Sequence, residues 1–292
     1  MHVHLVDGTY EIFRYHFALP SHVTGAGQEV AATRGVLGSM LTLLEDGATH
    51  VGIATDHVIE SFRNDLWPGY KSSAGMPPEL LGQFQLLEDV LEAAGFTVFA
   101  MVEYEADDAM GASAAVADAD PRVEKVWICT PDKDLGQCVV GDRVVQLDRR
   151  KGVEIDAAGV EERFGVPPAS IPDYLALVGD SADGFPGLAG WGAKSAATVL
   201  ARYGHLEDIP ALSADWDVSV RGAGKLAATL QEQFDLAVLF RRIATVERDA
   251  PTVTDVEALR WTGPTPELRA LAGALDAPNL AARAERLAEA RS

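Results

Sequence analysis

The chain has 292 residues, a net charge of −20 at pH 7 and 48% hydrophobic residues. This length fits one large domain or two smaller ones, and the apolar content can fill a core. No apolar run of about 18 residues and no basic leader occurs, so we expect neither a membrane span nor a signal peptide. The two cysteines match no disulfide framework or zinc-ligand spacing, so we expect a protein of the reducing cytoplasm.

The negative charge argues against a nucleic-acid partner only if the acids are spread evenly, because phosphate affinity normally rests on Lys and Arg. Acids that converge on bound divalent cations invert the local sign of charge. Whether the chain can bind nucleic acid therefore depends more on where the acids lie than on how many there are.

Three short apolar runs rich in β-branched residues are predicted as buried strands, at residues 2–7, 49–56 and 124–132. Helical patterns start at Ala31, at Pro77 and after Asp107. This alternation predicts a mostly parallel α/β sheet flanked by helices. After about residue 160 the chain becomes helical with glycine turns, and "GVPPAS" indicates a boundary near Val166.

Each predicted strand ends in an aspartate, and in parallel sheets ligands bind outside these carboxyl ends. Taken singly, such an aspartate is more often a turn former or a helix N-cap. Here further acids follow the third strand in "TPDKDL" and open a helix in "EYEADD". The acids expected at this edge are Asp7, Asp56, Asp132, Asp134, Glu105, Asp107 and Asp108.

The turn "VGDSADGFPG" adds Asp180 and Asp183, for which an Asx turn is the alternative interpretation. Carboxylates gathered in one crevice repel one another and need compensating cations. Ligands that are all oxygen suit Mg²⁺ or Mn²⁺ rather than zinc. Two such ions about 4 Å apart cleave phosphodiesters, so this is the chemistry that the acids predict.

These motifs, together with "LVDG", "TDHVIESFRNDLWPGYK" and "GDSADGFPGLAGWGAKSA", resemble the 5′-nuclease (flap endonuclease) family over about residues 3–245. That family includes the 5′-nuclease domain of bacterial DNA polymerase I and stand-alone bacterial 5′–3′ exonucleases. The resemblance implies a PIN-like catalytic domain at 1–165, with a helical arch at about 63–85. It also implies a helical DNA-binding region at 166–292, with a helix–hairpin–helix (helix-3-turn-helix) at about 172–204 and C-terminal helices.

The resemblance divides the acids into two metal groups that bind two or more Mg²⁺ or Mn²⁺ ions. The first group would be Asp7, Asp56, Glu105, Asp107 and Asp108. The second would be Asp132, Asp134, Asp180 and Asp183. Every family position is acidic here, which indicates an active nuclease.

The family's basic positions match Arg14, Arg63 and Lys71. The resemblance implies that Arg63 and Lys71 are catalytic, because cations beside the scissile phosphate stabilise developing charge, and that Arg14 contacts DNA. From the residues alone, Arg63 and Lys71 could equally be solvated helix and loop residues. After "GYK" the chain reads "SSAGMPPEL", without the further basic residues that are frequent in the family, which predicts a weaker grip on single strands.

"GLAGWGAKSAATVL" resembles a helix–hairpin–helix that binds a DNA phosphate on backbone N–H groups, often with a monovalent cation such as K⁺. Gly190, Gly192 and Lys194 would make that contact, and Arg221 and Lys225 a second one. A glycine-rich turn between packed helices is the alternative.

The sequence thus predicts a metal-dependent 5′–3′ exonuclease and flap endonuclease that acts on flaps, nicks and gaps in DNA replication and repair. A DNA polymerase and a ligase would act as separate partners, and the setting would be the cytoplasm at the nucleoid. A non-catalytic binder of branched DNA is the alternative, although a pure binder gains nothing from acids that face phosphates. A haloacid-dehalogenase-like phosphatase is disfavoured, since Leu5 stands where its nucleophilic aspartate belongs.

Overall fold

The computed structural model describes residues 1–291, which divide into two compact units. The first unit comprises residues 1–59, 73–130 and the chain from Glu247 onward. The second unit comprises residues 60–72 and 131–246. The predicted domain division at residues 165 and 166 stays a prediction.

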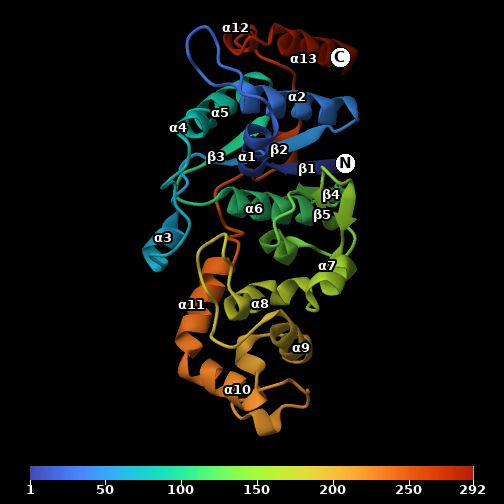
Figure 1. The fold of residues 1–292 in the computed structure, drawn as a ribbon. Coiled ribbons are helices and arrows are strands. Elements are labelled where there is room, and N and C mark those ends of the chain that lie inside the picture. The colour runs from blue at the N-terminus through green and yellow to red at the C-terminus, as the bar shows by residue number, and fades with distance from the viewer. Residues whose placement is uncertain (292) are drawn as a thin grey trace. The chain divides into compact units, whose positions relative to one another are not determined.

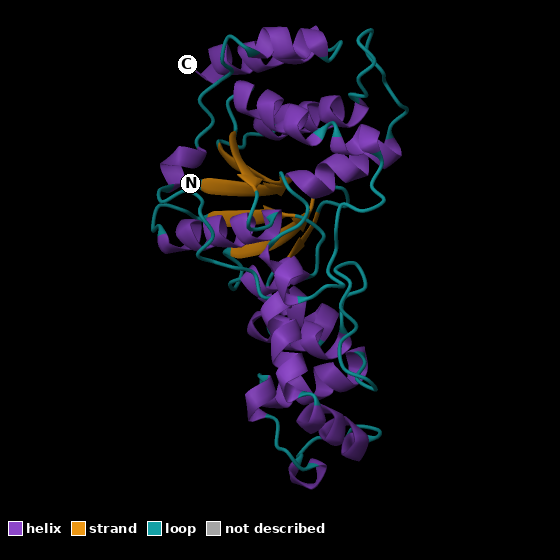
Figure 2. Ribbon diagram, turned by 90° about the vertical axis from the view of Figure 1, so that its left-hand side faces the viewer, coloured by secondary structure: helices purple, strands orange, loops and turns teal. Residues whose placement is uncertain are grey.

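The first unit is a parallel sheet covered by helices on both faces (Figures 1 and 2). Its strands pair in the order β3-β2-β1-β4, and every pair is parallel. Helix α6 lies on one face, whereas α1 and α5 lie on the other and α2 packs on both of these. The elements are β1 (His2–Asp7), α1 (Gly8–Ala18), α2 (Ala31–Glu45), β2 (His50–Asp56), α4 (Pro78–Leu81), α5 (Phe84–Ala93), β3 (Thr97–Met101), α6 (Ala106–Ala119), β4 (Lys125–Cys129), α12 (Leu268–Ala274) and α13 (Pro278–Arg291).

The second unit is mainly helical and carries one antiparallel strand pair, β5 with β6. Its core consists of apolar side chains from α8, α9, α10 and α11, with Phe185 and Phe240 almost fully buried at its centre. The elements are α3 (Phe62–Leu66), a 3-10 helix at Asp134–Cys138, β5 (Val144–Asp148), β6 (Val153–Ile155), α7 (Ala157–Phe164), α8 (Ile171–Val178), α9 (Ala193–Tyr203), α10 (Ala223–Glu232) and α11 (Phe234–Ala244).

The predicted mixed α/β fold with a mostly parallel sheet is confirmed, and two of its elements need correction. The third predicted strand ends at Cys129 and not at Asp132, because Pro131 has no N–H with which to extend the ladder. The predicted helix from Pro77 is interrupted at Gly82 and Gln83. Glycine is a weak helix former, and the side-chain oxygen of the buried Gln83 accepts hydrogen bonds from the N–H and the hydroxyl of Thr33 in α2. Within residues 1–291, no helix is both long and apolar enough to cross a bilayer.

Candidate metal centre and DNA-binding turn

Asp7 ends β1 and caps the N-terminus of α1. Its Oδ1 accepts the N–H of Tyr10 at 2.7 Å, and its Oδ2 accepts the hydroxyl of Thr130 at 2.8 Å. The N-cap interpretation is therefore right for Asp7. It does not exclude metal binding, because each carboxylate oxygen has a second lone pair.

Asp56 ends β2 and connects it to the starts of two helices. Its Oδ1 accepts the N–H of Ala106, the first residue of α6, at 2.8 Å. Its own N–H donates to the hydroxyl of Thr9 in α1, also at 2.8 Å. These bonds hold Asp56 next to Glu105 and tie both to the first turn of α1.

The start of α6 carries the remaining acids of the first group. Glu105 is the buried N-cap, and its N–H donates to Asp108 Oδ2 at 2.9 Å. Asp108 is fully buried, and its Oδ1 accepts the N–H of Glu247 at 2.8 Å. Asp107 is half-buried in the first turn, where the helix dipole favours negative charge. The role of this group as metal ligands stays a prediction.

Three acids of the second group form a candidate cation site. Oxygens of Asp134, Asp180 and Asp183 lie within 4.8 Å of one another. Asp134 begins the 3-10 helix, and the other two lie in the turn after α8. Asp132 is placed beside them, since its Oδ1 accepts the N–H of Asp134 at 3.0 Å.

The electrostatics of this cluster call for a cation. Burial, followed by the carboxylates of Asp132, Asp183 and Asp180, raises the pKa of Asp134 well above its usual range. Asp134 Oδ1 is buried and has no hydrogen-bond partner within residues 1–291. The nearest compensating charge is Lys133, whose Nζ lies 2.5 Å from Asp180 Oδ2. A donor set made only of carboxylates fits a hard divalent ion.

Lys71 lies at this cluster within the second unit. Its Nζ is 3.4 Å from Asp183 Oδ1, and its N–H donates to the carbonyl of Asp183 at 3.1 Å. Its side chain is only 29% exposed, so the alternative of a freely solvated loop residue does not describe it. Its catalytic role stays a prediction, and this position supports it.

Arg63 is buried, with 3% of its surface exposed, which rules out the alternative of a solvated helix residue. Its Nε donates to the carbonyl of Ile243 and its Nη2 to that of Thr245, each at 2.8 Å. These contacts fix the segment at 60–72 to the end of α11. The predicted catalytic role of Arg63 is untested, and the contacts describe an anchoring residue.

Two glycines shape the turn that carries Asp180 and Asp183. Gly179 and Gly187 both have positive φ, and a Cβ on either would lie 2.4 Å from backbone atoms of the facing strand of the turn. The Asx-turn interpretation is also right, because Asp180 Oδ1 accepts the N–H of Ala182 at 2.9 Å. Close backbone packing therefore sets the positions of both carboxylates.

The predicted phosphate-binding turn lies between α8 and α9. Gly190 has a φ of +86°, and Gly190, Gly192 and Lys194 are exposed. Trp191 between them is buried against Trp216 and donates to the carbonyl of Leu226 at 3.3 Å. The turn is thus fixed from inside while its backbone faces solvent.

The other predicted DNA contacts lie apart from this turn in sequence. Arg221 and Lys225 are exposed at the start of α10. Arg14 forms an ion pair with the buried Glu11 and stacks over Tyr15 with 4.1 Å to the ring centre. The DNA-binding role of all these residues stays a prediction.

Four residues with clear positions in these sites were not predicted from the sequence. Thr9 and Thr130 orient Asp56 and Asp7, and Lys133 compensates Asp180. Glu88 is buried on α5, where its two oxygens lie 2.6 Å from Thr55 Oγ1 and from His57 Nδ1, on either side of Asp56. Only Lys133 has a sequence signal, its place between the two acids of "PDKD".

Comparison with known families assigns the fold and the class of protein. The family model described as "5'-3' exonuclease, N-terminal resolvase-like domain" matches residues 2–165. The model described as "5'-3' exonuclease, C-terminal SAM fold" matches residues 166–267. This chain belongs to the 5′-3′ exonuclease family. It is a nuclease by family, as the motifs predicted, and the predicted resemblance is confirmed.

Curated relatives of this exonuclease chain are DNA polymerases. It is 35% identical over 264 residues to DNA polymerase I of Mycobacterium leprae, which covers 88% of this chain and 28% of the relative. It is 32% identical to DNA polymerase I of Bacillus subtilis, which covers 89% of this chain and 29% of the relative. The exonuclease chain thus spans less than a third of the length of these relatives.

Solved structures share the fold of this exonuclease at low sequence identity. The T5 5′-exonuclease with zinc bound has a TM-score of 0.65 and 18% identity, covering 99% of each chain. Flap endonuclease-1 from Methanococcus jannaschii has a TM-score of 0.60 and 15% identity, covering 100% of this chain and 93% of that one. The catalytic core of Rad2 in complex with DNA substrate has a TM-score of 0.61 and 15% identity, covering 97% of this chain and 90% of that one.

Proposed function

We propose that this member of the 5′-3′ exonuclease family hydrolyses DNA phosphodiesters at 5′ ends and at the junctions of 5′ flaps, nicks and gaps, leaving a 5′-phosphate and a 3′-hydroxyl. The observation that carries the proposal is the cluster of the buried Asp134 and Asp180 with the half-buried Asp183, in which Asp134 Oδ1 is buried without a partner within residues 1–291. The setting is DNA replication and repair at the nucleoid in the cytoplasm, with a DNA polymerase and a ligase as partners.

We expect Mg²⁺ or Mn²⁺ at each acidic group. Asp134, Asp180 and Asp183 would hold one ion, with Asp132 beside them. Asp7, Asp56, Glu105, Asp107 and Asp108 would hold the other. Divalent ions bound there would lower the pKa of the attacking water and would stabilise the leaving oxygen.

The chain's own residues bind and orient the substrate. Lys71, held at Asp183, places a positive charge beside the cluster, where it can stabilise charge that develops on a phosphate. Gly190 and Gly192 are exposed beside the start of the 11-residue helix α9, and the N–H groups of a helix start suit a backbone phosphate. The N–H of Gly192 itself donates to Ser195 Oγ at 3.0 Å. Binding of K⁺ at this turn, and phosphate contacts from Arg14, Lys194, Arg221 and Lys225, belong to the same proposal.

The test is single-turnover cleavage of a labelled 5′-flap duplex in Mg²⁺ and in EDTA. Wild type should release a short 5′ fragment only with metal. Asp134→Asn should cleave at least about tenfold more slowly, equivalent to 1.4 kcal/mol, with nearly unchanged flap binding. Asp142→Asn, at an exposed aspartate of the same unit, is the matched control and should cleave at the wild-type rate.

The alternatives predict different results in the same assay. An intact flap that is bound tightly in Mg²⁺ would favour the non-catalytic binder. Hydrolysis confined to small phosphate monoesters would favour a phosphatase. Wild-type turnover by Asp134→Asn would remove the second acidic group from the mechanism.

A further inference from the structure

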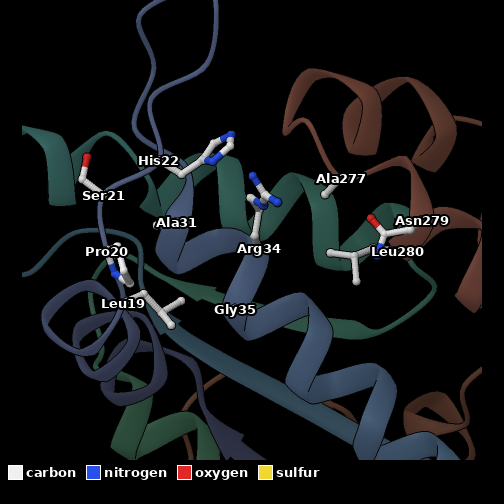
Figure 3. A pocket seen from close by; sticks show the side chains of 10 residues that line it. All are labelled: Leu19, Pro20, Ser21, His22, Ala31, Arg34, Gly35, Ala277, Asn279 and Leu280. Atoms are coloured by element: carbon white, nitrogen blue, oxygen red, sulfur yellow. The ribbon is translucent and has the colours of Figure 1, made fainter.

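The first unit contains a pocket that the nuclease chemistry does not use. It has a volume of about 450 Å³ and lies between the α1–α2 connection, α2 itself and the start of α13 (Figure 3). Its apolar wall includes Leu19, Ala31 and Leu280, and its polar groups are Ser21, His22, Arg34 and Asn279. The family models end at residue 267, so the wall from α13 lies outside the matched region.

Arg34 is the unusual residue of this pocket. Figure 3 shows its side chain rising from α2 between His22 and Ala277. The guanidinium Nη1 is buried without a hydrogen-bond partner. No carboxylate of the described chain pairs with it, although the sequence contains 44 Asp and Glu residues. A partly buried charge without a partner is unfavourable, so the chain retains this arginine at a cost in stability.

The acids near Arg34 are engaged elsewhere. Glu29 Oε1 accepts the N–H groups of His22 at 3.0 Å and Ala31 at 2.9 Å, and its Oε2 accepts the hydroxyl of Ser21. Asp276 Oδ2 lies 3.1 Å from His22 Nε2. Asp276 is also the one non-glycine residue with positive φ within residues 1–291, at +53°. The loops around the pocket are therefore fixed by their own bonds, and the guanidinium is left for another acceptor.

We propose that this pocket binds a small organic anion. Its carboxylate or phosphate group would accept two parallel hydrogen bonds from Arg34, the geometry that a guanidinium offers to oxyanions. Its apolar body would lie against Leu19, Ala31 and Leu280. The volume is within the range of roughly 300–1,000 Å³ that is typical of small-molecule sites, and a mainly apolar wall with few polar groups is their usual lining.

The charge of the surroundings favours a ligand with a single anionic group over a nucleic acid. Arg34 is the only Lys or Arg among the residues that line the pocket in the described structure. A neighbouring pocket that shares Ser21 is lined by Glu29 and Glu79. A nucleic-acid strand would place several phosphates next to these acids, which would repel them. A ligand with a single oxyanion group needs only the one guanidinium that the pocket offers.

The experiment is an NMR titration of the ¹⁵N-labelled full chain with hexanoate, hexyl phosphate, hexanamide and a single-stranded oligonucleotide. Hexanoate or hexyl phosphate should shift amide signals of both residues 19–35 and residues 277–281 and should saturate below about 10 mM. Whichever of the two binds more tightly identifies the source as carboxylate or phosphate. The neutral amide should bind at least tenfold more weakly.

Variants separate a ligand site from a structural arginine. Arg34→Met should abolish the anion-dependent shifts while leaving the Tm of the free protein unchanged or raised, because an unpaired charge is removed. Arg34→Lys should bind with intermediate affinity. Arg286→Gln, at an exposed arginine of α13, changes the net charge equally to Arg34→Met and should bind as wild type.

Four outcomes would overturn the proposal. They are an absence of saturation by either anion, equal binding of hexanamide, a fall of several degrees in Tm for Arg34→Met, and saturation by the oligonucleotide alone, which would assign the pocket to nucleic acid. Flap cleavage by Arg34→Met should equal that of wild type, so the result does not depend on the proposed nuclease function.

Discussion

The carboxylates of the two acidic groups are stabilised in different ways, residue by residue. In the first group, both oxygens of Asp7 and of Asp108 accept hydrogen bonds from N–H or O–H donors. In the second group, Asp134 has a buried oxygen without a donor, and its neighbours are carboxylates. Donors favour the ionised form of a carboxyl, whereas burial among like charges disfavours it. The second group should therefore respond far more strongly to metal removal.

The raised pKa of Asp134 predicts how the metal-free protein responds to pH. A group whose pKa is higher in the folded than in the unfolded state stabilises the fold fully below its unfolded pKa, about 3.9 for aspartate. That contribution is lost as the pH rises through the folded pKa. In EDTA, the free energy of unfolding of wild type should fall as the pH rises from about 3.9 through the folded pKa of Asp134, and that of Asp134→Asn should fall less.

Denaturant unfolding at several pH values, with and without Mg²⁺, measures this difference. Because the bound ion needs the deprotonated carboxylate, Mg²⁺ should stabilise wild type more at high pH and should stabilise Asp134→Asn only weakly. Asp142→Asn should follow wild type in both conditions. Parallel pH profiles for wild type and Asp134→Asn in EDTA would show that Asp134 ionises normally.

At the scale of elements, the two basic residues of the segment at 60–72 have different contacts. Arg63 anchors the segment to the end of α11, whereas Lys71 lies at the acidic cluster. Arg63→Ala would leave the carbonyls of Ile243 and Thr245 without their donor, which costs about 1–3 kcal/mol for each buried acceptor. Lys71 forms a partly exposed ion pair, so Lys71→Ala should cost at most about 1 kcal/mol. We expect Arg63→Ala to lower stability and Lys71→Ala to lower the cleavage rate.

Denaturant unfolding and single-turnover flap cleavage, performed on both variants, test this division. Lys71→Ala should cleave at least about tenfold more slowly with nearly unchanged flap affinity. Arg163→Ala, at an exposed arginine of α7, is the control for loss of an arginine and should match wild type in stability. A stable Arg63→Ala that cleaves slowly would instead make Arg63 catalytic.

The elements that could be predicted from the sequence are those with a clear pattern in their own residues. Strands β1, β2 and β4 are continuous apolar runs, and α6 follows a capping pattern, so local signals sufficed. Strands β3, β5 and β6 have three to five residues each, too short for a distinctive period. The break between α4 and α5 falls at Gly82 and Gln83, and the contact of Gln83 with Thr33, 50 residues away in the chain, carries no local signal. The pocket at Arg34 escaped prediction for the same reason, since its walls meet only in the folded chain.

On the scale of the whole molecule, the charge balance of 24 basic and 44 acidic residues constrains how the chain binds DNA. The predicted DNA contacts from side chains are few, and Arg14 among them is paired with Glu11. A polyanion approaching a protein of net charge −20 is repelled unless acids are neutralised first. Divalent ions on the two acidic groups would therefore act in binding as well as in chemistry.

The last prediction follows from that balance. At constant ionic strength, replacing Mg²⁺ by EDTA should weaken the affinity of the Asp134→Asn variant for a 5′-flap duplex less than it weakens that of Lys71→Ala. Asp134→Asn has already lost a negative charge and a metal ligand, whereas Lys71→Ala keeps the whole acidic cluster. Fluorescence anisotropy with a labelled flap measures both affinities, and Lys71→Ala should lose at least about tenfold, or 1.4 kcal/mol. The neutral change Thr254→Ala, at an exposed residue of the first unit, should lose affinity in EDTA to the same extent as wild type. Equal affinities in Mg²⁺ and EDTA for Lys71→Ala would mean that the acids are not neutralised by divalent ions before DNA binds, and the DNA would then have to approach on the exposed basic residues of α9 and α10 alone.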